Sequence, residues 1–498
     1  MKFASFLGTK DRISDFLEKE LMLRHRSRPF LRGSVLVSQL GFGTYRVHHK
    51  VFEHHEALLI ALQCGVNLID TATIYTDGSA ETLIGNVLKE MAPSGYTRDQ
   101  YVIVSKLGFV ANEAMAGLWP DVLQYAENSF YCLHPDFIRH EVDESLRRLG
   151  IGGLDAMLLH NPESLLEKLG EDEFYLRLKN AFDCLEELVQ NQKIRYYGIS
   201  SNTLALPEDS RDRIDLVRVL GIASEVAQTR GIVSSHFQVI ELPLNPMEHQ
   251  AATLKNLVWE GESFTVLDLA KKLGLDVMIN RPLNAVYKNE LFRLAKKPFE
   301  EGVEYRPRFI QCLKRVQKFE DQIWKFMEGS SQLTAFVANS TDFKAFSMGT
   351  ELSNMLDLLQ NEDHWAEVMH SFAMFHTQKS LQLFDKIFGN QSGFDFSCFA
   401  QDYLESLGEL EEAIVGFLHR REFFEVTEPL FDKFGPDFFS DAESHSASVI
   451  RFLQDLPGRP VVLNGMRCRD YVRDATSSLI EEVHPQISEV LSVLKRHF

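Results

Sequence analysis

Short apolar runs alternate with longer amphipathic segments from about residue 35 to residue 283. Each apolar run is rich in Val, Ile and Leu, and each following segment repeats its apolar positions with helical periodicity. Continuous apolar runs predict strands buried on both faces, and their alternation with helices predicts parallel β/α units. The predicted strands are 37–44, 66–72, 101–108, 154–161, 194–201, 237–245 and 275–283. The helices predicted after the first six are 54–65, 79–91, 135–150, 173–193, 210–227 and 263–274.

Seven units in series with one spacing predict an α/β fold of the (β/α)8 TIM-barrel type. Gly65, Gly150 and Gly274 each stand directly before a predicted strand, at the position where helices commonly end. An open doubly wound sheet would need a G-x-G-x-x-G motif after its first strand. The stretch "GFGTYR" (41–46) has Arg46 in place of the third glycine and no helix directly after it, so the closed barrel is the better prediction.

The eighth strand is expected only at "RPVVLNG" (459–465), followed by a helix over 468–483. The segment before it is dense in Phe, Leu, Asp and Glu and has helical periodicity. It therefore predicts a mostly helical insertion after strand seven, on the face of the barrel where active sites lie. The expected parts are an N-terminal helical extension (1–30), seven barrel units (31–285), the helical insertion (286–456) and the eighth unit (457–498).

Composition limits the partners of this fold. The chain has 71 acidic and 52 basic residues, and its net charge of −19 disfavours nucleic acid and anionic membranes as partners. Six dispersed cysteines without a C-x-x-C pair predict free thiols in a reducing compartment. Lys10, Asp11, Arg12 and Asp15 interrupt the N-terminal stretch, which predicts a helix there instead of a signal peptide. No apolar run is long enough to span a bilayer, so the sequence predicts a cytoplasmic protein.

Ionisable side chains stand at the ends of three consecutive predicted strands. The second strand ends near Asp70, with Tyr75 in the following turn, the third carries Lys106, and the fourth carries His160. Burying such groups together costs several kcal/mol unless they satisfy one another, so their joint presence favours a site of chemistry. An ammonium lowers the pKa of a neighbouring phenol, and a carboxylate can hold that ammonium in place. With a neutral His160 orienting a carbonyl oxygen, Tyr75 is expected to act as a general acid or base in hydride transfer from a nicotinamide.

Each of these residues alone has a structural explanation, such as an Asp that caps a turn.

The sequence lacks the motifs that identify two other enzyme classes. A metal-dependent barrel hydrolase would need H-x-H on the first strand, whereas the clustered histidines His48, His49, His54 and His55 surround the first helix. A serine hydrolase would need G-x-S-x-G, which is absent. The sequence therefore predicts no metal site.

The motifs "LGFGTYRV", "NLIDTATIYTDGSAETLIG", "VIVSKLG", "LLHNPE" and "IRYYGISSN" together resemble the aldo-keto reductase family. The resemblance covers roughly residues 31–285 and 457–485. It implies a (β/α)8 barrel with a short hairpin closing its floor, and Asp70, Tyr75, Lys106 and His160 as the catalytic tetrad. It also implies NADPH, bound in an extended pose, and the reduction of an aldehyde, ketone or sugar carbonyl to an alcohol or the reverse reaction.

The resemblance further implies which residues bind the cofactor. Ser200 matches a serine that holds the carboxamide, while Ser201 stands where the family has Asn and Asn202 comes one position later. Glu241 stands where the family has Gln and could still accept a hydrogen bond from the amide. Arg467, at a predicted helix start, is the candidate ligand of the 2′-phosphate and favours NADP over NAD. The remaining implied cofactor contacts are Gly43, Thr44, Arg281, Pro282, Leu283, Gly465, Tyr471 and Asp474.

A cofactor-binding sensor or regulatory protein is the alternative function. Some members of the resembled family are auxiliary subunits of ion channels, and the acidic, Phe-rich insertion could dock a protein partner. The intact tetrad favours the enzyme, with a small carbonyl or alcohol as its substrate.

Overall fold

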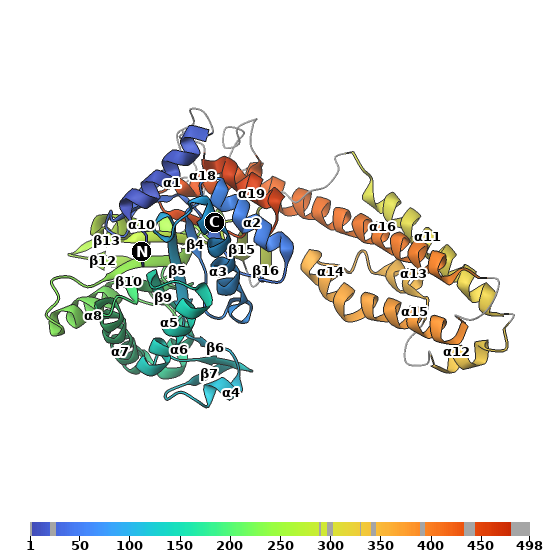
Figure 1. Ribbon diagram of the computed structural model, residues 1–498, viewed down its shortest axis with the longest axis horizontal. Coiled ribbons are helices and arrows are strands. Elements are labelled where there is room, and N and C mark those ends of the chain that lie inside the picture. Colours follow the sequence, from blue (N-terminus) through green and yellow to red (C-terminus); the bar gives the residue numbers. More distant parts are fainter. Residues whose placement is uncertain are drawn as a thin grey trace. The chain divides into compact units, whose positions relative to one another are not determined.

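The computed structural model describes residues 2–19, 26–287, 290–295, 302–328, 330–339, 345–388, 394–432 and 444–479 (Figure 1). The chain divides into two compact units, one formed by Met1–Ala295 with Phe434–Phe498 and the other by Lys296–Lys433. The last part of the expected eighth unit, residues 480–498, lies outside the described residues.

Eight parallel strands close into a barrel in the first unit, in the order β10-β11-β14-β17-β3-β4-β5-β9. The strands are β3 (Leu40–Gly43), β4 (Leu68–Asp70), β5 (Val102–Leu107), β9 (Leu154–His160), β10 (Ile194–Ser200), β11 (Phe237–Pro243), β14 (Asp276–Asn280) and β17 (Val461–Asn464). The predicted fold class is therefore confirmed. Because every neighbouring pair is parallel, the C-terminal ends of all eight strands lie at one rim.

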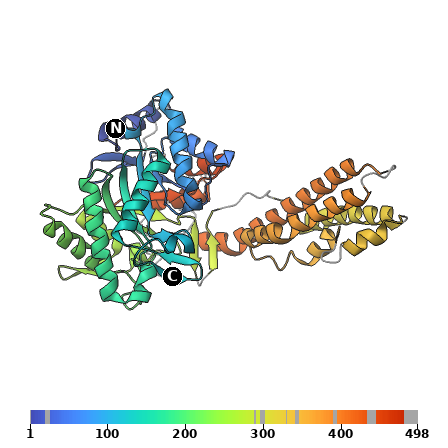
Figure 2. The ribbon, with the colours of Figure 1, turned by 60° about the horizontal axis from the view of Figure 1, so that its bottom comes forward.

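Helices surround these strands and bury their apolar faces against them (Figure 2). The longer ones are α2 (Phe52–Gln63), α3 (Ser79–Met91), α5 (Pro135–Leu149), α7 (Glu171–Gln190), α8 (Leu216–Thr229), α10 (Val266–Leu273), α18 (His445–Gln454) and α19 (Arg469–Thr476). Gly65, Gly150 and Gly274 have φ values of 89°, 66° and 69°. This left-handed backbone is open to glycine and ends a helix, so the predicted helix ends are confirmed.

The N-terminal segment closes the floor of the barrel. The hairpin of β1 (Ser27–Phe30) and β2 (Val35–Ser38) places Phe30, Leu31, Val35 and Val37 in one core with residues of the barrel strands. Helix α1 (Phe6–Lys19) packs beside β2. The floor is thus a filled core, and the opposite rim carries the predicted site.

Short elements in the loops were not predicted because their runs are too short to show a period. A three-stranded sheet follows β5, made of β6 (Phe109–Val110), β7 (Leu123–Ala126) and β8 (Ser129–Tyr131). Two hairpins pair β12 (Leu257–Trp259) with β13 (Glu262–Phe264) and β15 (Asn284–Tyr287) with β16 (Glu290–Arg293). The short helices are α4 (Glu113–Ala116), α6 (Glu163–Leu169) and α9 (Gln250–Thr253).

The second unit is helical around its own Phe-rich core, within the residues described. Its helices are α11 (Tyr305–Glu328), α12 (Leu333–Asn339), α13 (Met348–Glu351), α14 (Glu362–Val368), α15 (Met374–Phe388), α16 (Phe396–Glu422) and α17 (Glu428–Asp432). A buried carboxylate, Glu320, ties three of them by accepting hydrogen bonds from the Tyr403 hydroxyl at 2.9 Å and the Gly349 amide at 3.0 Å. No helix in the described parts of the chain is long and apolar enough to cross a membrane.

The second unit is narrower than the expected insertion of 286–456. The β15–β16 hairpin and α18 belong to the barrel unit. Helix α18 packs against α19 and β17, and the Gln39 side chain donates to the Gln454 carbonyl at 2.8 Å. Periodicity identifies α18 as a helix but does not show which core its apolar face joins, which explains the difference.

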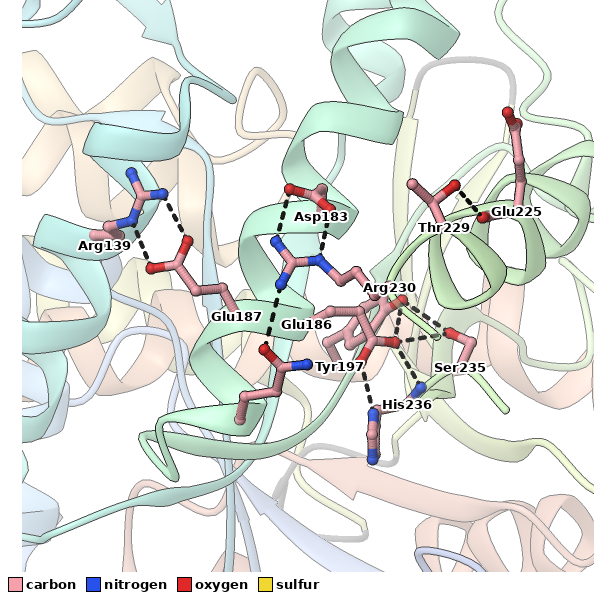
Figure 3. A network of polar contacts seen from close by, with 11 residues as sticks. Arg139, Asp183, Glu186, Glu187, Tyr197, Glu225, Thr229, Arg230, Ser235 and His236 are labelled. Atoms are coloured by element: carbon pink, nitrogen blue, oxygen red, sulfur yellow. Dashed lines mark hydrogen bonds and ion pairs between the residues drawn. The ribbon is translucent and has the colours of Figure 1, made fainter. Parts of the chain in front are cut away.

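A buried carboxylate connects α7 to the start of β11 (Figure 3). Glu186 is fully buried and accepts hydrogen bonds from the Tyr197 hydroxyl at 3.0 Å, the Ser235 hydroxyl at 3.2 Å and the His236 amide at 2.8 Å. The His236 Nδ1 atom lies 2.6 Å from its second oxygen. Burial raises the pKa of Glu186, but the hydrogen bonds and charge of His236 outweigh it, so the pKa lies below its usual value.

We expect Glu186→Gln to lower the free energy of unfolding by about 2–4 kcal/mol, because an amide cannot accept from all of these donors. Glu187→Gln on the same helix is the matched control. Its carboxylate pairs with Arg139 near the surface at 2.8 Å, and its loss should cost less than about 1 kcal/mol. Urea unfolding at pH 7 measures both, and equal effects would contradict the prediction.

The contribution of Glu186 to the free energy of unfolding should also depend on pH. Because the folded-state pKa is the lower one, this stability is present above the unfolded-state pKa of about 4.3 and is lost as the pH falls through the folded-state pKa. The gap between wild type and Glu186→Gln should therefore narrow in acid.

Candidate active site

Lys106 stands at the centre of a cluster of ionisable side chains at the C-terminal rim. Its Nζ lies 2.6 Å from each carboxylate oxygen of Asp70 and 3.3 Å from the Tyr75 hydroxyl. Asp70 ends β4 and lies opposite Val104 of β5, and the parallel register brings Lys106 up beside it. Lys106 is fully buried and Asp70 is nearly so. Because water cannot stabilise these charges, the ammonium and the carboxylate stabilise each other.

Tyr75 is presented by a tight turn with unusual backbone. It opens a 3₁₀ turn, Tyr75–Gly78, in which Thr76, Asp77 and Gly78 have φ values of 47°, 55° and 79°. Left-handed backbone is costly for a β-branched residue, so contacts must hold the turn in place. The Thr76 hydroxyl supplies one by donating to the Val47 carbonyl at 2.6 Å. The phenol is thereby fixed over the end of β4.

His160 ends β9 and faces the phenol edge to face. The His160 and Tyr75 rings lie 5.6 Å apart at 82°, and Phe109 packs on the other side of His160 at 4.9 Å. Burial, helped by the Lys106 charge, lowers the pKa of His160 well below its usual value. The imidazole is therefore neutral at pH 7. Its buried Nδ1 has no hydrogen-bond partner among the described residues, so it is available to a ligand.

The pKa of Tyr75 is raised, whereas the sequence predicted that it would be lowered. Burial raises it, the Lys106 ammonium lowers it, and the carboxylates of Asp70 and Glu241 raise it again, so the net shift is upward. The expected net acidification of the phenol is thus wrong, because burial of the phenol outweighs the effect of the ammonium and the two carboxylates add to the upward shift. Burial alone would lower the pKa of Lys106, but Asp70 and Glu241 outweigh it and the pKa is raised. At neutral pH the site therefore holds an ammonium and a protonated phenol.

Glu241 of β11 is the second carboxylate of this cluster and is 1% exposed. Its Oε1 accepts hydrogen bonds from the Ser200 hydroxyl at 3.0 Å and the Asn280 amide at 2.8 Å. Its Oε2 lies 3.4 Å from the Lys106 Nζ. The sequence indicated Glu241 only as a cofactor contact and gave no sign of Asn280, because a side-chain hydrogen bond between β11 and β14 joins them only in the folded chain.

The other expected cofactor residues lie at the same rim. Thr44 follows β3 and donates its hydroxyl to the Asp70 carbonyl at 2.9 Å. Arg281 follows β14 with a φ of 52°, and its guanidinium pairs with Glu248 at 2.7 Å. The remaining positions at strand ends are Gly43 of β3, Ser201 and Asn202 after β10, Pro282 and Leu283 after β14, and Gly465 after β17.

Helix α19 begins two residues after Arg467 and carries the expected residues Tyr471 and Asp474. Its first residue, Arg469, pairs with Glu56 of α2 at 2.6 Å. Of these two arginines, Arg467 is the better candidate for an anionic ligand, since Arg469 already has a carboxylate partner.

Glu163 is a residue at the rim that sequence reasoning did not single out. It opens α6, is 8% exposed, and accepts a hydrogen bond from the Asn202 amide at 2.8 Å. Burial raises its pKa to about 7, although this hydrogen bond opposes the shift. The motif "LLHNPE" contains Glu163, but only the fold places it against the loop after β10 and so ties that loop to the one that follows His160.

The buried polar groups of this rim fit the carboxamide of a nicotinamide. An amide offers two N–H donors and one carbonyl acceptor. Glu241 Oε2 and Asn280 Oδ1 are buried acceptors without a hydrogen-bond partner in the described part of the chain. The Ser200 hydroxyl, now turned to Glu241, is the neighbouring donor. Among the described residues, no cluster of three or more His, Cys, Asp or Glu could hold a metal ion.

Comparisons with known proteins find relatives of part of the chain. A profile described as "Aldo/keto reductase family" matches residues 39–223. The chain is 25% identical over 240 residues, 48% of its length, to a putative voltage-gated potassium channel subunit beta of Schizosaccharomyces pombe, of which it covers 62%. It is 33% identical over 147 residues, 29% of its length, to the NADH-specific methylglyoxal reductase of Escherichia coli, of which it covers 40%. The chain thus spans about half the length of these relatives.

The solved structure of the glycerol dehydrogenase AKR11B4 from Gluconobacter oxydans is similar at 17% identity and a TM-score of 0.46, with 95% of each chain covered. The family profile spans β4, β5 and β9, which carry Asp70, Lys106 and His160. Residues 39–223 of the chain are thus similar to the aldo/keto reductase family.

Proposed function

We propose that this protein transfers hydride between NADPH and a carbonyl compound, reducing an aldehyde, ketone or sugar to an alcohol or running the reverse reaction. The observation that carries the proposal is the Tyr75 hydroxyl, 3.3 Å from the buried Lys106 ammonium and edge to face with a neutral His160. We propose the cytoplasm as its compartment, since all six cysteines are free thiols.

Tyr75 is the proposed general acid in reduction and the general base in oxidation. A protonated phenol can give its proton to the oxygen of the forming alcohol, and the resulting phenolate is stabilised by Lys106. Asp70 holds that ammonium in register through both of its oxygens. His160, neutral and with an unpaired buried nitrogen, can orient the carbonyl oxygen beside the phenol.

The nicotinamide, when bound, supplies or accepts the hydride. Ser200, Glu241 and Asn280 would hold its carboxamide, which matches their donor and acceptor set. Arg467, before the N-terminus of α19, would hold the 2′-phosphate that distinguishes NADPH from NADH.

A cofactor-binding regulatory protein is the second candidate. One relative is named as a putative channel subunit, and the helical unit of residues 296–433 would then be the surface for a protein partner. Steady turnover of NADPH with a panel of aldehydes separates the two. NADPH binding without turnover above background would favour the regulatory protein.

We expect Tyr75→Phe to reduce kcat for carbonyl reduction by about 10²–10⁴-fold, because it removes the proposed proton donor. The dissociation constant for NADPH should stay within about twofold. Tyr45→Phe is the matched control, since Tyr45 packs against Tyr75 at 5.4 Å and is 61% exposed. It loses a hydroxyl beside the site and should keep most of the activity. Similar losses in the two variants would contradict the role of Tyr75.

Lys106→Met should lower both activity and the free energy of unfolding, the latter by about 3–5 kcal/mol. The reason is that two buried carboxylates lose their counter-ion. Lys89→Met removes an exposed ammonium at the end of α3 and should change stability by less than about 0.5 kcal/mol. Urea unfolding at pH 7 compares the two variants, and a stable Lys106→Met would show that the ion pair is not needed for folding.

Arg467→Ala should weaken NADPH binding by about 10–100-fold and leave NADH binding nearly unchanged, because only NADPH carries the 2′-phosphate. Arg469→Ala is the matched control, since its guanidinium already pairs with Glu56. Fluorescence titration measures all four dissociation constants. If Arg467→Ala weakened the binding of NADPH and NADH equally, Arg467 would not bind the 2′-phosphate.

A further inference from the structure

One buried ammonium at the candidate site is shared by two carboxylates. Lys106 donates to both oxygens of Asp70 at 2.6 Å, the geometry of an ammonium bound to an ionised carboxylate. Glu241 brings a second carboxylate to the same nitrogen at 3.4 Å. Asp70 alone suffices to neutralise Lys106, so the charge of Glu241 needs another explanation.

Both carboxyl oxygens of Glu241 have polar neighbours. Oε1 accepts from Ser200 and Asn280, and Oε2 lies beside the Lys106 ammonium. A glutamine in the same place would put its NH2 group against one of these donors. A carboxylate meets these three neighbours with an oxygen, whereas a glutamine would need Ser200 and Asn280 to reorient as acceptors.

The Glu241 charge reaches Tyr75 through Lys106. The Tyr75 hydroxyl and Glu241 Oε2 both contact the Lys106 Nζ, at 3.3 Å and 3.4 Å. The other groups that face Tyr75 are the carboxylate of Asp70 from β4, the neutral ring of His160 from β9, and the Tyr45 ring from the loop after β3. The phenol thus shares one ammonium with two carboxyl groups.

We propose that Glu241 is a positioning residue that acts on Tyr75 through Lys106. Its charge offsets that of the ammonium and so opposes ionisation of the phenol, which keeps Tyr75 in its proton-donating form over a wider pH range. This inference rests on the proposed function, whose proton donor it concerns.

The electrostatic shifts at the site agree with this role. After burial, Lys106 and Asp70, the Glu241 charge is a further contribution to the pKa of Tyr75, and it acts upward. Burial and then Glu241 raise the pKa of Asp70, which is the cost of placing two carboxylates at one ammonium. An extra charge at this separation changes a partly buried pKa by about one to two units at an effective dielectric constant near 20.

The test is the ionisation of Tyr75 in Glu241→Gln, measured without substrate or cofactor. Stopped-flow jumps to a series of alkaline pH values record phenolate absorbance before the protein can unfold. Each protein is compared with its Tyr75→Phe counterpart, so the difference reports Tyr75 alone. We expect Tyr75 to ionise about one to two pH units lower in Glu241→Gln than in the wild type. Ionisation at the same or a higher pH would overturn the proposal.

Two controls separate charge from packing. Glu241→Asp keeps the charge and should shift the ionisation much less than Glu241→Gln. Asn280→Ala removes a donor to the same carboxylate without changing the charge at Lys106. A shift in Asn280→Ala as large as that in Glu241→Gln would contradict a charge effect. If circular dichroism shows that Glu241→Gln does not fold, Glu241→Ala removes the same charge and takes its place.

The pH profile of turnover adds the functional readout. In Glu241→Gln, the alkaline limb of kcat/KM for carbonyl reduction should move about one to two pH units lower, since that limb follows loss of the proton from the donor. An alkaline limb at the wild-type pH would overturn the coupling of Glu241 to the proton donor. If no carbonyl compound is turned over but Tyr75 ionises earlier in Glu241→Gln, the proposed function fails while the coupling of Glu241 to Tyr75 stands.

Discussion

The ion pair between Lys106 and Asp70 is the interaction on which the candidate site depends. A fully buried ammonium is stable only with a close counter-ion and further acceptors, and Asp70 provides the counter-ion through both oxygens. This requirement fixes the relative height of β4 and β5, and with it the turn that presents Tyr75. The phenol is not acidified, because its burial outweighs the effect of the ammonium and the carboxylates bound to that ammonium oppose the effect further.

Buried carboxylates serve different purposes at the two ends of the barrel. At the floor, Asp276 accepts from the Arg28 guanidinium and the Leu31 amide, both at 2.7 Å, and so ties the N-terminal hairpin to β14. At the rim, the carboxylates of Asp70 and Glu241 converge on one ammonium and leave an acceptor unpaired. The Asp276 carboxylate at the floor is thus satisfied within the chain, whereas the rim keeps an unpaired carboxylate oxygen that a ligand can satisfy.

The helical unit of residues 296–433 follows the same physical rules with a different composition. Its phenylalanines form a shared core, as in the stacked rings of Phe384 and Phe388 at 4.9 Å. Its buried carboxylate, Glu320, is satisfied by a phenol and a backbone amide within the unit. The unit therefore supplies its own packing and its own hydrogen-bond partners, independently of the barrel strands between which it is inserted in the sequence.

The sequence by itself determined the barrel and the four candidate catalytic residues. Short apolar runs that alternate with amphipathic helices indicate strands buried on both faces, and their parallel order places Asp70, Lys106 and His160 at one rim. The hairpins and short strands could not be predicted, since too few residues repeat a pattern. The placement of α18 could not be predicted either, because an apolar face does not identify its partner. Only the tertiary structure decided which charged groups surround Tyr75. Glu241 and Lys106 are 135 residues apart in the chain, yet their side chains meet at 3.4 Å. Electrostatic energy depends on that distance in space and not on separation in the sequence.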